Sequence, residues 1–408
     1  MSGNPRPGRP GFLALELDGD GAHPAAWRKA RHAPDELLNG ARIRSTVLAA
    51  ESAGFHVATF ADGRVSSGRD IAGRLNALQR AAFAGPVTSS IVLVPEVDTV
   101  YTEPFHVSTQ LASLDYVSGG RAGWLVAASG SAEEAAAVGR SFAEGAALAQ
   151  KAAASVEVSR RLWDSWEDGA VIRDVATGRY LDVDKLHYVD FETPADFPGP
   201  GYSVKGPSII PRPLQGQLPV VAQAGLLPSD VDVVLVSAPT PSLLAAEVAE
   251  VHRAIAGGGA VVGAGPALAG GAAVVAELDV VLDARGQSAS GRLAELDAFT
   301  PWPSSRARFV GTAAELVDFL AELLVVADGI RLHPAVLDVE LEELAQLVLP
   351  ELRRRGALKP VAQGGTFREL LGLDRPVSRY GDAGALAALG AAAGLGAAAG
   401  AAVVGSEN

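Results

Sequence analysis

Apolar and polar residues follow a pattern along the chain that predicts strands and helices in turn. Eight segments, each an apolar run bounded by turn residues, predict strands over 12–18, 56–61, 86–97, 123–129, 218–222, 231–237, 260–263 and 328–332. Segments with apolar residues at helical spacing lie between most of them, over 36–53, 71–78, 105–116, 132–166, 242–255, 312–324 and 341–355. Strands that alternate with helices are typical of a parallel sheet.

This alternation favours an α/β fold, a (β/α)8 TIM barrel, because one barrel of about 250 residues or more accommodates eight strands and their insertions. A doubly wound open sheet is the alternative. That fold usually carries a glycine-rich turn after its first strand, and Gly19-Asp20-Gly21 is an imperfect version of such a turn. Residues 169–210 interrupt the alternation with Gly, Pro and aromatic residues, and they predict a hairpin insertion after the fourth βα unit.

The two ends of the chain differ from the barrel region, which we place at 12–358. Residues 1–11 are rich in Pro, Gly and Arg and lack an apolar run, so we expect a disordered N-terminus without a secretory signal. Residues 359–408 form a C-terminal extension, in which 383–406 carry no charge and are mostly Ala and Gly. This composition predicts a low-complexity tail. A membrane span is the alternative, but Leu is scarce there and insertion would be weakly driven.

Composition narrows the classes of function. The formal net charge is −13 and there is no long basic run, so we expect neither nucleic acid nor an anionic membrane surface as a partner. The chain has no cysteine, which excludes disulfides, thiolate metal sites and cysteine nucleophiles. We therefore expect a cytoplasmic protein.

Several long motifs identify a family. The two most specific are LASLDYVSGGRAGW at 111–124 and RRLWDSWEDGAVIRD at 160–174. Further motifs that belong to the same family pattern lie at 21–28, 50–63, 99–110, 184–192, 204–225 and 327–338. Through these motifs the chain resembles the bacterial-luciferase-like, flavin-dependent monooxygenases, and among them the nitrilotriacetate, dibenzothiophene-sulfone and pristinamycin-synthase monooxygenase subgroup.

The resemblance implies a luciferase-like barrel with its active site at the C-terminal ends of the strands. It implies an oxidoreductase, a monooxygenase that uses reduced FMN and O2 on a small organic substrate. A separate NAD(P)H-dependent flavin reductase would be the partner that supplies the reduced FMN. In such an enzyme the flavin carries the difficult chemistry, while the protein positions the flavin and excludes water.

The resemblance also assigns residues to the cofactor. The positions that match the flavin site are Asp62, Trp124, Ser129, Gln223 and Gly225. Asp62 precedes Gly63, so a turn-forming aspartate explains it equally well. Packing of the barrel is an alternative explanation for Trp124. No catalytic residue can be assigned from the motifs.

Four positions depart from the family pattern around the flavin ring. Glu96 and Asp98 stand where the family has a Thr-x-Ser pair, and they would place negative charge beside an electron-rich reduced flavin. Their spacing puts both carboxylates on one face of a strand, where they could act as an acid/base pair or form a solvated rim. Leu125 and Ala128 replace an Asn and a Thr, and neither side chain can form a hydrogen bond.

The segment that holds the FMN phosphate in the family is also altered. In the family, Gln-Ala-Gly is followed by Ser-x-x-Gly and a helix whose N-terminus binds the phosphate. Here 223–225 is followed by 226–230 and then by the predicted strand at 231–237, so we expect this helix to be absent. Ser229 could offer a weak phosphate contact, which the charge of Asp230 would oppose.

The histidines suggest no metal site. His187 lies near Asp182 and Asp184, but three loop ligands without a fourth do not define a site, so we expect a hydrogen-bonded hairpin and no metal. We expect His333 to orient the loop after the last strand.

Three hypotheses for the function remain. The first is an active two-component FMN-dependent monooxygenase. The second is a catalytically impaired or inactive barrel without cofactor, which pairs with an intact paralogue as its supporting chain. The third is a flavin-free reaction that uses Glu96 and Asp98. We expect a homo-oligomer or a heteromer with an intact paralogue. The substrate cannot be inferred, because a fold does not fix a substrate.

Overall fold

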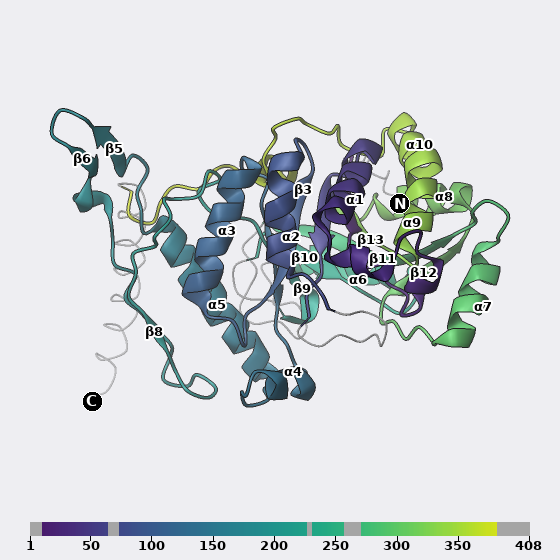
Figure 1. The fold of residues 1–408 in the computed structure, drawn as a ribbon, viewed down its shortest axis with the longest axis horizontal. Coiled ribbons are helices and arrows are strands. Elements are labelled where there is room, and N and C mark those ends of the chain that lie inside the picture. The colour runs from purple at the N-terminus through teal and green to yellow at the C-terminus, as the bar shows by residue number, and fades with distance from the viewer. Residues whose placement is uncertain (1–9, 64–72, 227–230, 257–270, 382–408) are drawn as a thin grey trace, which may run out of the picture.

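The computed structural model describes residues 10–63, 73–226, 231–256 and 271–381. Within these residues, eight parallel strands close into a barrel (Figure 1). In their order around the barrel they are β1 (Phe12–Glu16), β2 (Val57–Phe60), β3 (Val92–Asp98), β4 (Trp124–Ala127), β9 (Val220–Gln223), β10 (Val233–Val236), β11 (Ala273–Leu282) and β13 (Gly329–Pro334). The predicted (β/α)8 TIM barrel is confirmed.

Helices cover the outside of the barrel. Their bounds are α1 (Gly40–Ala53), α2 (Ala77–Ala84), α3 (Pro104–Ser118), α4 (Ala132–Ala137), α5 (Ala146–Asp164), α6 (Pro241–Ala256), α7 (Ala289–Phe299), α8 (Ala313–Leu323), α9 (Leu337–Glu343), α10 (Leu349–Arg354) and α11 (Phe367–Leu371). A further strand, β12 (Ala307–Gly311), pairs with the C-terminal half of β11. Among the described residues, no helix has the length and apolar character needed to cross a membrane.

The strands have two apolar faces. Residues that point outward pack against the helices and form the large core. Residues that point inward form a second cluster, which fills the N-terminal half of the barrel and includes Phe12, Val94 and Leu125. Phe367 of α11 belongs to this cluster, and a Cβ on Gly123 would lie 2.6 Å from its ring. The C-terminal extension thus supplies the side chain that closes the barrel at the N-terminal ends of its strands.

The predicted insertion after the fourth βα unit is confirmed. It contains two antiparallel pairs, β5 (Val171–Asp174) with β6 (Arg179–Leu181) and β7 (Phe191–Glu192) with β8 (Ser203–Val204). The β5–β6 hairpin projects away from the barrel (Figure 1).

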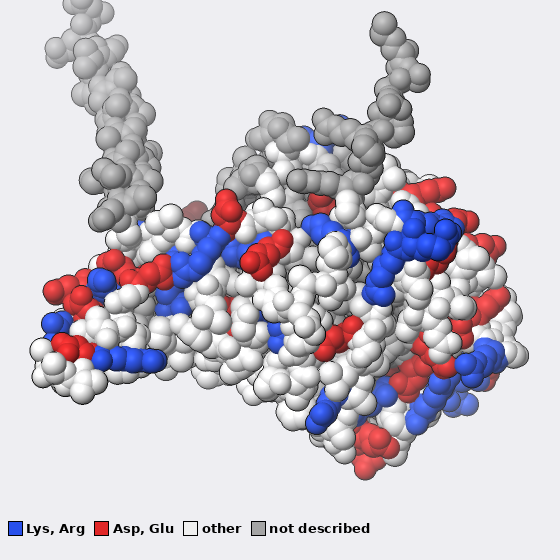
Figure 2. All heavy atoms as spheres, turned by 90° about the horizontal axis from the view of Figure 1, so that it is seen from above, with Lys and Arg blue, Asp and Glu red and all other residues white. Residues whose placement is uncertain are grey.

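Charged side chains of both signs are interspersed on the face that Figure 2 shows. The net charge of −13 is therefore not gathered into one acidic surface on that face.

The seventh strand differs from the prediction. The segment 260–263 lies outside the described residues, and the strand in that place in the barrel is β11. The sequence pattern gave no predicted strand or helix between 264 and 311, but this region contains β11, α7 and β12. The acidic residues Glu277 and Asp279 interrupt the apolar run of β11, so the sequence pattern did not indicate a buried strand there.

Three predicted helices also have different bounds. The tract at 132–166 is broken into α4 and α5, with Gly139 and Gly145 between them at φ +64° and +57°. The helix expected at 71–78 begins only at Ala77, and residues 71 and 72 lie outside the described residues. The last helix contains a π-helical turn before Pro350, which lacks the N–H that a regular helix requires.

Candidate active site at the barrel mouth

The inward-facing positions become polar at the C-terminal ends of the strands, which form the mouth of the barrel. β1 contributes Glu16, β2 contributes Thr59, β11 contributes Glu277 and β13 contributes Arg331 and His333. Each continues an alternation whose earlier inward positions are apolar, because side chains two residues apart share one face of a strand. The barrel interior is therefore apolar at the N-terminal ends of the strands and charged at their C-terminal ends.

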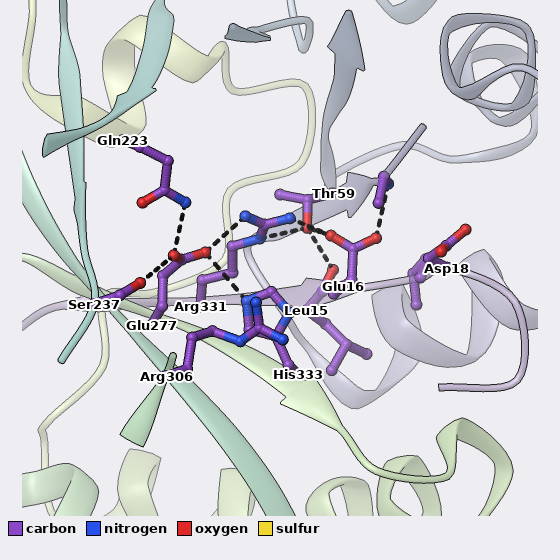
Figure 3. Close-up of polar contacts among 12 residues, drawn as sticks. Leu15, Glu16, Asp18, Thr59, Gln223, Ser237, Glu277, Arg306, Arg331 and His333 are labelled. Carbon is purple, nitrogen blue, oxygen red and sulfur yellow. Dashed lines mark hydrogen bonds and ion pairs between the residues drawn. The ribbon is translucent and has the colours of Figure 1, made fainter. Parts of the chain in front are cut away.

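Arg331 lies between two carboxylates at the centre of this polar layer (Figure 3). Its terminal nitrogens donate to Glu277 Oε1 at 2.8 Å and to Glu16, and its Nε donates to Thr59 Oγ1 at 2.9 Å. The exposed fractions of Glu16, Glu277 and Arg331 are 7%, 1% and 4%. Removal of one partner from a buried ion pair of this kind is strongly destabilising, because it leaves an uncompensated buried charge.

Glu277 also contacts β9, the residue after β10 and a second residue of β13. It accepts hydrogen bonds from Gln223 Nε2 at 2.7 Å and Ser237 Oγ at 2.6 Å, and His333 Nε2 lies 3.2 Å from it (Figure 3). Burial opposes ionisation of Glu277, but the hydrogen bond from His333 and the charge of Arg331 hold its pKa well below the usual range. Burial and the Arg331 charge lower the pKa of His333, which favours the neutral imidazole.

The carboxyl group of Glu16 is ionised as well. Burial alone would raise its pKa, but the charges of Arg331 and His333 and the hydrogen bond from Thr59 lower the pKa of Glu16 to about 2. Two carboxylates thus share one guanidinium, and the lowered pKa of His333 favours its uncharged form. The buried layer carries an excess of one negative charge.

A cavity of about 390 Å³ lies at the ends of β2, β3 and β4, and Glu96 in its lining is close enough to Glu16 and Arg331 for their charges to act on it. The acidic residues that line it are Asp62, Glu96, Asp98 and Glu134, and Arg74 is the basic residue among the described lining. Arg74 is paired with Asp18 at 2.9 Å, outside this lining. The volume lies within the range of small-molecule pockets, roughly 300–1,000 Å³.

The environment of Glu96, one of the carboxyl groups of this cavity, changes its ionisation. Burial raises its pKa to about 7, against the opposing charge of Arg331, and repulsion from Glu16, Asp18 and Asp62 adds to the rise. No hydrogen bond from the described residues reaches its carboxyl group.

The comparisons with known proteins agree with this architecture. The model of the family described as "Luciferase-like monooxygenase" matches residues 23–325. The chain belongs to the luciferase-like monooxygenase family. It is 28% identical to N-acetyl-S-(2-succino)cysteine monooxygenase of Bacillus subtilis, over 90% of this chain and 98% of that protein. It is also 28% identical to nitrilotriacetate monooxygenase component A of Aminobacter aminovorans, over 71% and 77% of the two chains.

Other matches support the fold and the subgroup. The solved structure of EDTA monooxygenase from Chelativorans sp. BNC1 matches with a TM-score of 0.72 and 17% identity, over 90% of this chain and 99% of that one. Pristinamycin IIA synthase of Streptomyces pristinaespiralis is represented by two different polypeptides. One is 33% identical over 45% of this chain and 57% of its own length, and the other is 30% identical over 53% and 47%.

In this luciferase-like barrel, Asp62 acts as a turn residue. Its carboxylate accepts hydrogen bonds from Gly63 N at 2.9 Å, Asn76 Nδ2 at 2.6 Å and Ala77 N at 3.3 Å. It therefore stabilises the start of α2, as a short acidic side chain does at a helix N-terminus. A contact between Asp62 and a cofactor stays a prediction.

Ser129 and Asp98 are tied to each other at the rim. Asp98 accepts hydrogen bonds from Ser129 N and Tyr101 N, both at 2.8 Å. The hydroxyl of Ser129 donates to the carboxylate of Glu134. These contacts join the loops that follow β3 and β4.

Trp124 and Leu125 lie on opposite faces of β4. Trp124 packs edge-on against Trp163 of α5, with ring centroids 6.3 Å apart, and its Nε1 donates to Val97 O at 3.4 Å. It belongs to the core between barrel and helices, as the packing alternative predicts. Leu125 faces the barrel interior, and Ala128 lines the mouth cavity.

Gln223 and Gly225 lie at the end of β9. Gln223 donates to Glu277, and Gly225 is part of a 3-10 turn with open space around its Cα. Only residues 224–232 separate β9 from β10, fewer than the dozen or so of a usual parallel crossover. Ser229 and Asp230 lie outside the described residues.

In the described part of the chain, no group of three or more ligand-type side chains converges. His187 instead pairs with Glu167 at 2.6 Å and stacks on Tyr380, with ring centroids 4.1 Å apart.

The sequence reasoning missed Glu16, Glu277 and Arg331. They lie in strands that are otherwise mostly apolar, in FLALE, AVVAELDVVL and GIRLHP. A charged residue at an inward position of a buried strand requires a partner, and that signal could have found all three.

Proposed function

We propose that this chain is a luciferase-like barrel that no longer holds reduced FMN firmly, and that it does not itself carry out the flavin-dependent oxygenation. The observation that carries the proposal is the acidic mouth. Among the described residues, four carboxylates and Arg74 line the cavity, and in the neighbouring buried layer Glu16 and Glu277 share the guanidinium of Arg331.

Electrostatics oppose the cofactor in such a mouth. FMN brings a phosphate dianion, and its reduced ring is electron-rich. Two like charges about 4 Å apart cost ~1 kcal/mol in water and ~4 kcal/mol near a protein surface. Glu96 and Asp98 would add this repulsion where the family has two hydroxyl groups.

The polar groups that the resemblance assigns to FMN are also engaged elsewhere. Asp62 accepts from backbone and side-chain groups of α2, Ser129 is bound to Asp98 and Glu134, and Gln223 donates to Glu277. The short crossover at 224–232 leaves no length for the helix that binds the phosphate in the family. The described residues therefore do not fit the FMN site that the family pattern requires.

A supporting role in a heteromer follows from this proposal. Pristinamycin IIA synthase has two different polypeptides, and both resemble this chain. We propose that the present chain pairs with an intact paralogue that holds the flavin. Co-expression with such a paralogue, followed by size-exclusion chromatography, tests the pairing. Separate elution of the two chains would refute it.

An active two-component monooxygenase is the second candidate. Two observations favour it, the match to a monooxygenase over 98% of its length and a cavity at the family's active-site end. In this case an NAD(P)H-dependent reductase would supply reduced FMN, and Asp62, Ser129 and Gln223 would exchange their internal hydrogen bonds for contacts with the cofactor.

An anaerobic titration with reduced FMN separates the two candidates. We expect no saturable change in flavin absorbance or fluorescence up to about 100 µM FMN. The N-acetyl-S-(2-succino)cysteine monooxygenase of Bacillus subtilis serves as the matched positive control. Saturation at low micromolar FMN would restore the monooxygenase to first place.

A further inference from the structure

The described residues at the barrel mouth carry more negative than positive charge, which favours a cationic ligand. Two buried, ionised carboxylates, Glu16 and Glu277, share the guanidinium of Arg331, and Glu16 and Arg331 are close enough to Glu96 of the cavity lining to act on its ionisation. This excess charge lies in a low-dielectric setting, where it is screened far less than on the surface. The charges of the described residues therefore repel an anion in the cavity and attract a cation.

The acidic residues at the rim do not have equal roles. Asp98 accepts hydrogen bonds from two backbone N–H groups, and Asp62 accepts one from Gly63 N and two from the start of α2. Glu96 points from β3 into the same cavity, and its carboxyl group receives no hydrogen bond from the described residues. Glu96 is thus the carboxyl group with bonding capacity left for a ligand.

The arrangement of side chains in the cavity favours an organic ligand over a bare metal ion. Within the described residues, the carboxylates of the mouth do not converge into a group of three or more metal-ligating side chains. The cavity of about 390 Å³ also has apolar surface from Leu78, Val97 and Ala127. A ligand that fills such a space needs an apolar body in addition to its charge.

We propose that the mouth cavity binds an organic cation, with a primary ammonium group paired to the Glu96 carboxylate and an apolar body against Leu78, Val97 and Ala127. This inference rests on the proposed function, because a mouth that is open to this ligand is one that does not hold FMN. The ammonium group donates up to three hydrogen bonds, and Glu96 accepts at least one of them. The negative layer around Arg331 adds a longer-range attraction.

Three probes of equal size and different charge test the ligand class. Benzylamine, benzyl alcohol and benzoate are titrated separately into the full-length protein by calorimetry at pH 8. We expect benzylammonium to bind at least tenfold more tightly than benzyl alcohol, and benzoate to show no binding. Equal affinity for the three probes, or tighter binding of benzoate, would overturn the proposal.

A pair of variants tests the residue. Glu96→Gln keeps the size of the side chain and removes its charge, and we expect it to weaken benzylammonium binding at least tenfold. The matched control is Glu322→Gln, an exposed carboxylate of α8, for which we expect unchanged affinity. Unchanged affinity in Glu96→Gln would refute the role of Glu96. The wild-type probe series decides the ligand class even if this variant does not fold.

The flavin titration keeps this inference separable from the proposed function. Binding of neither benzylammonium nor reduced FMN refutes the cation site and leaves the proposed function standing. Binding of both supports the cation site and refutes the loss of FMN. Binding of FMN alone refutes both.

Discussion

Glu277 and Arg331 lie directly opposite each other in the parallel register of β11 and β13, and their side chains meet at 2.8 Å inside the barrel. Register alone brings them together, because both are inward-facing residues at the same level. The guanidinium then reaches across to Glu16 of β1. One side chain therefore connects three strands that are distant in the sequence, and it sets the charge of the mouth.

We predict that Arg331→Met strongly destabilises the fold. The change leaves Glu16 and Glu277 buried without their cation, which costs about 3–5 kcal/mol of unfolding free energy. Urea unfolding followed by circular dichroism measures the effect. The control is Arg355→Met, whose ion pairs with Glu351 and Asp318 are exposed, and we expect less than about 1 kcal/mol there. Equal losses in the two variants would contradict the central role of Arg331.

Glu96 gives a pH dependence of stability with a defined sign. Its folded-state pKa is raised from 4.5 to about 7, so the folded protein holds this proton more tightly than the unfolded chain does. Its contribution is most favourable below about pH 4.5, declines between 4.5 and 7, and stays low above 7. The groups that face it are Glu16, Asp18, Asp62 and Arg331.

Glu96→Gln should therefore stabilise the protein in a pH-dependent manner. We expect a gain of about 1–2 kcal/mol at pH 8, since partial solvent exposure reduces the full effect of the shift, and almost none at pH 4.5. Chemical denaturation of wild type and variant at several pH values measures the difference. A gain that is independent of pH would show that Glu96 does not titrate in this range.

Restoring the family's hydroxyl pair should improve flavin binding. We predict that at pH 8, where Glu96 is mostly ionised, Glu96→Thr combined with Asp98→Ser raises affinity for reduced FMN at least tenfold, because negative charge leaves the mouth. The anaerobic titration measures the change. A matched loss of two charges at the exposed Glu322 and Asp318 of α8 should leave FMN affinity unchanged. If the mouth variant binds no better than the control, charge is not what keeps FMN out.

The role of Phe367, which closes the barrel at the N-terminal ends of its strands, is also testable. Phe367→Ala removes a buried ring from the interior cluster, and we expect a loss of about 3–5 kcal/mol of unfolding free energy. The companion change Gly123→Ala places a Cβ 2.6 Å from the ring and should destabilise the protein too. Thermal and urea unfolding measure both. Native stability in Phe367→Ala would mean that the C-terminal extension is not part of the barrel core.

The sequence determined the fold class and the position of the insertion. Alternation of apolar strands and helices predicted the barrel, and the cluster of Gly, Pro and aromatic residues at 169–210 predicted the insertion, because these patterns are local properties of the chain. The same pattern misplaced the seventh strand, because Glu277 and Asp279 made β11 look too polar to be buried. Only the tertiary structure shows that Glu277 has Arg331, Gln223, Ser237 and His333 as partners.

The chemistry of the mouth was decided by tertiary structure for the same reason. The identities of Glu96 and Asp98 are evident in the sequence, but their hydrogen bonds are not. Asp98 accepts hydrogen bonds from two backbone N–H groups, whereas Glu96 receives none from the described residues. The pKa of Glu96 depends on residues 16, 18, 62 and 331, which only barrel closure brings near. Local propensity acts between near neighbours in the chain, whereas buried charges interact through space.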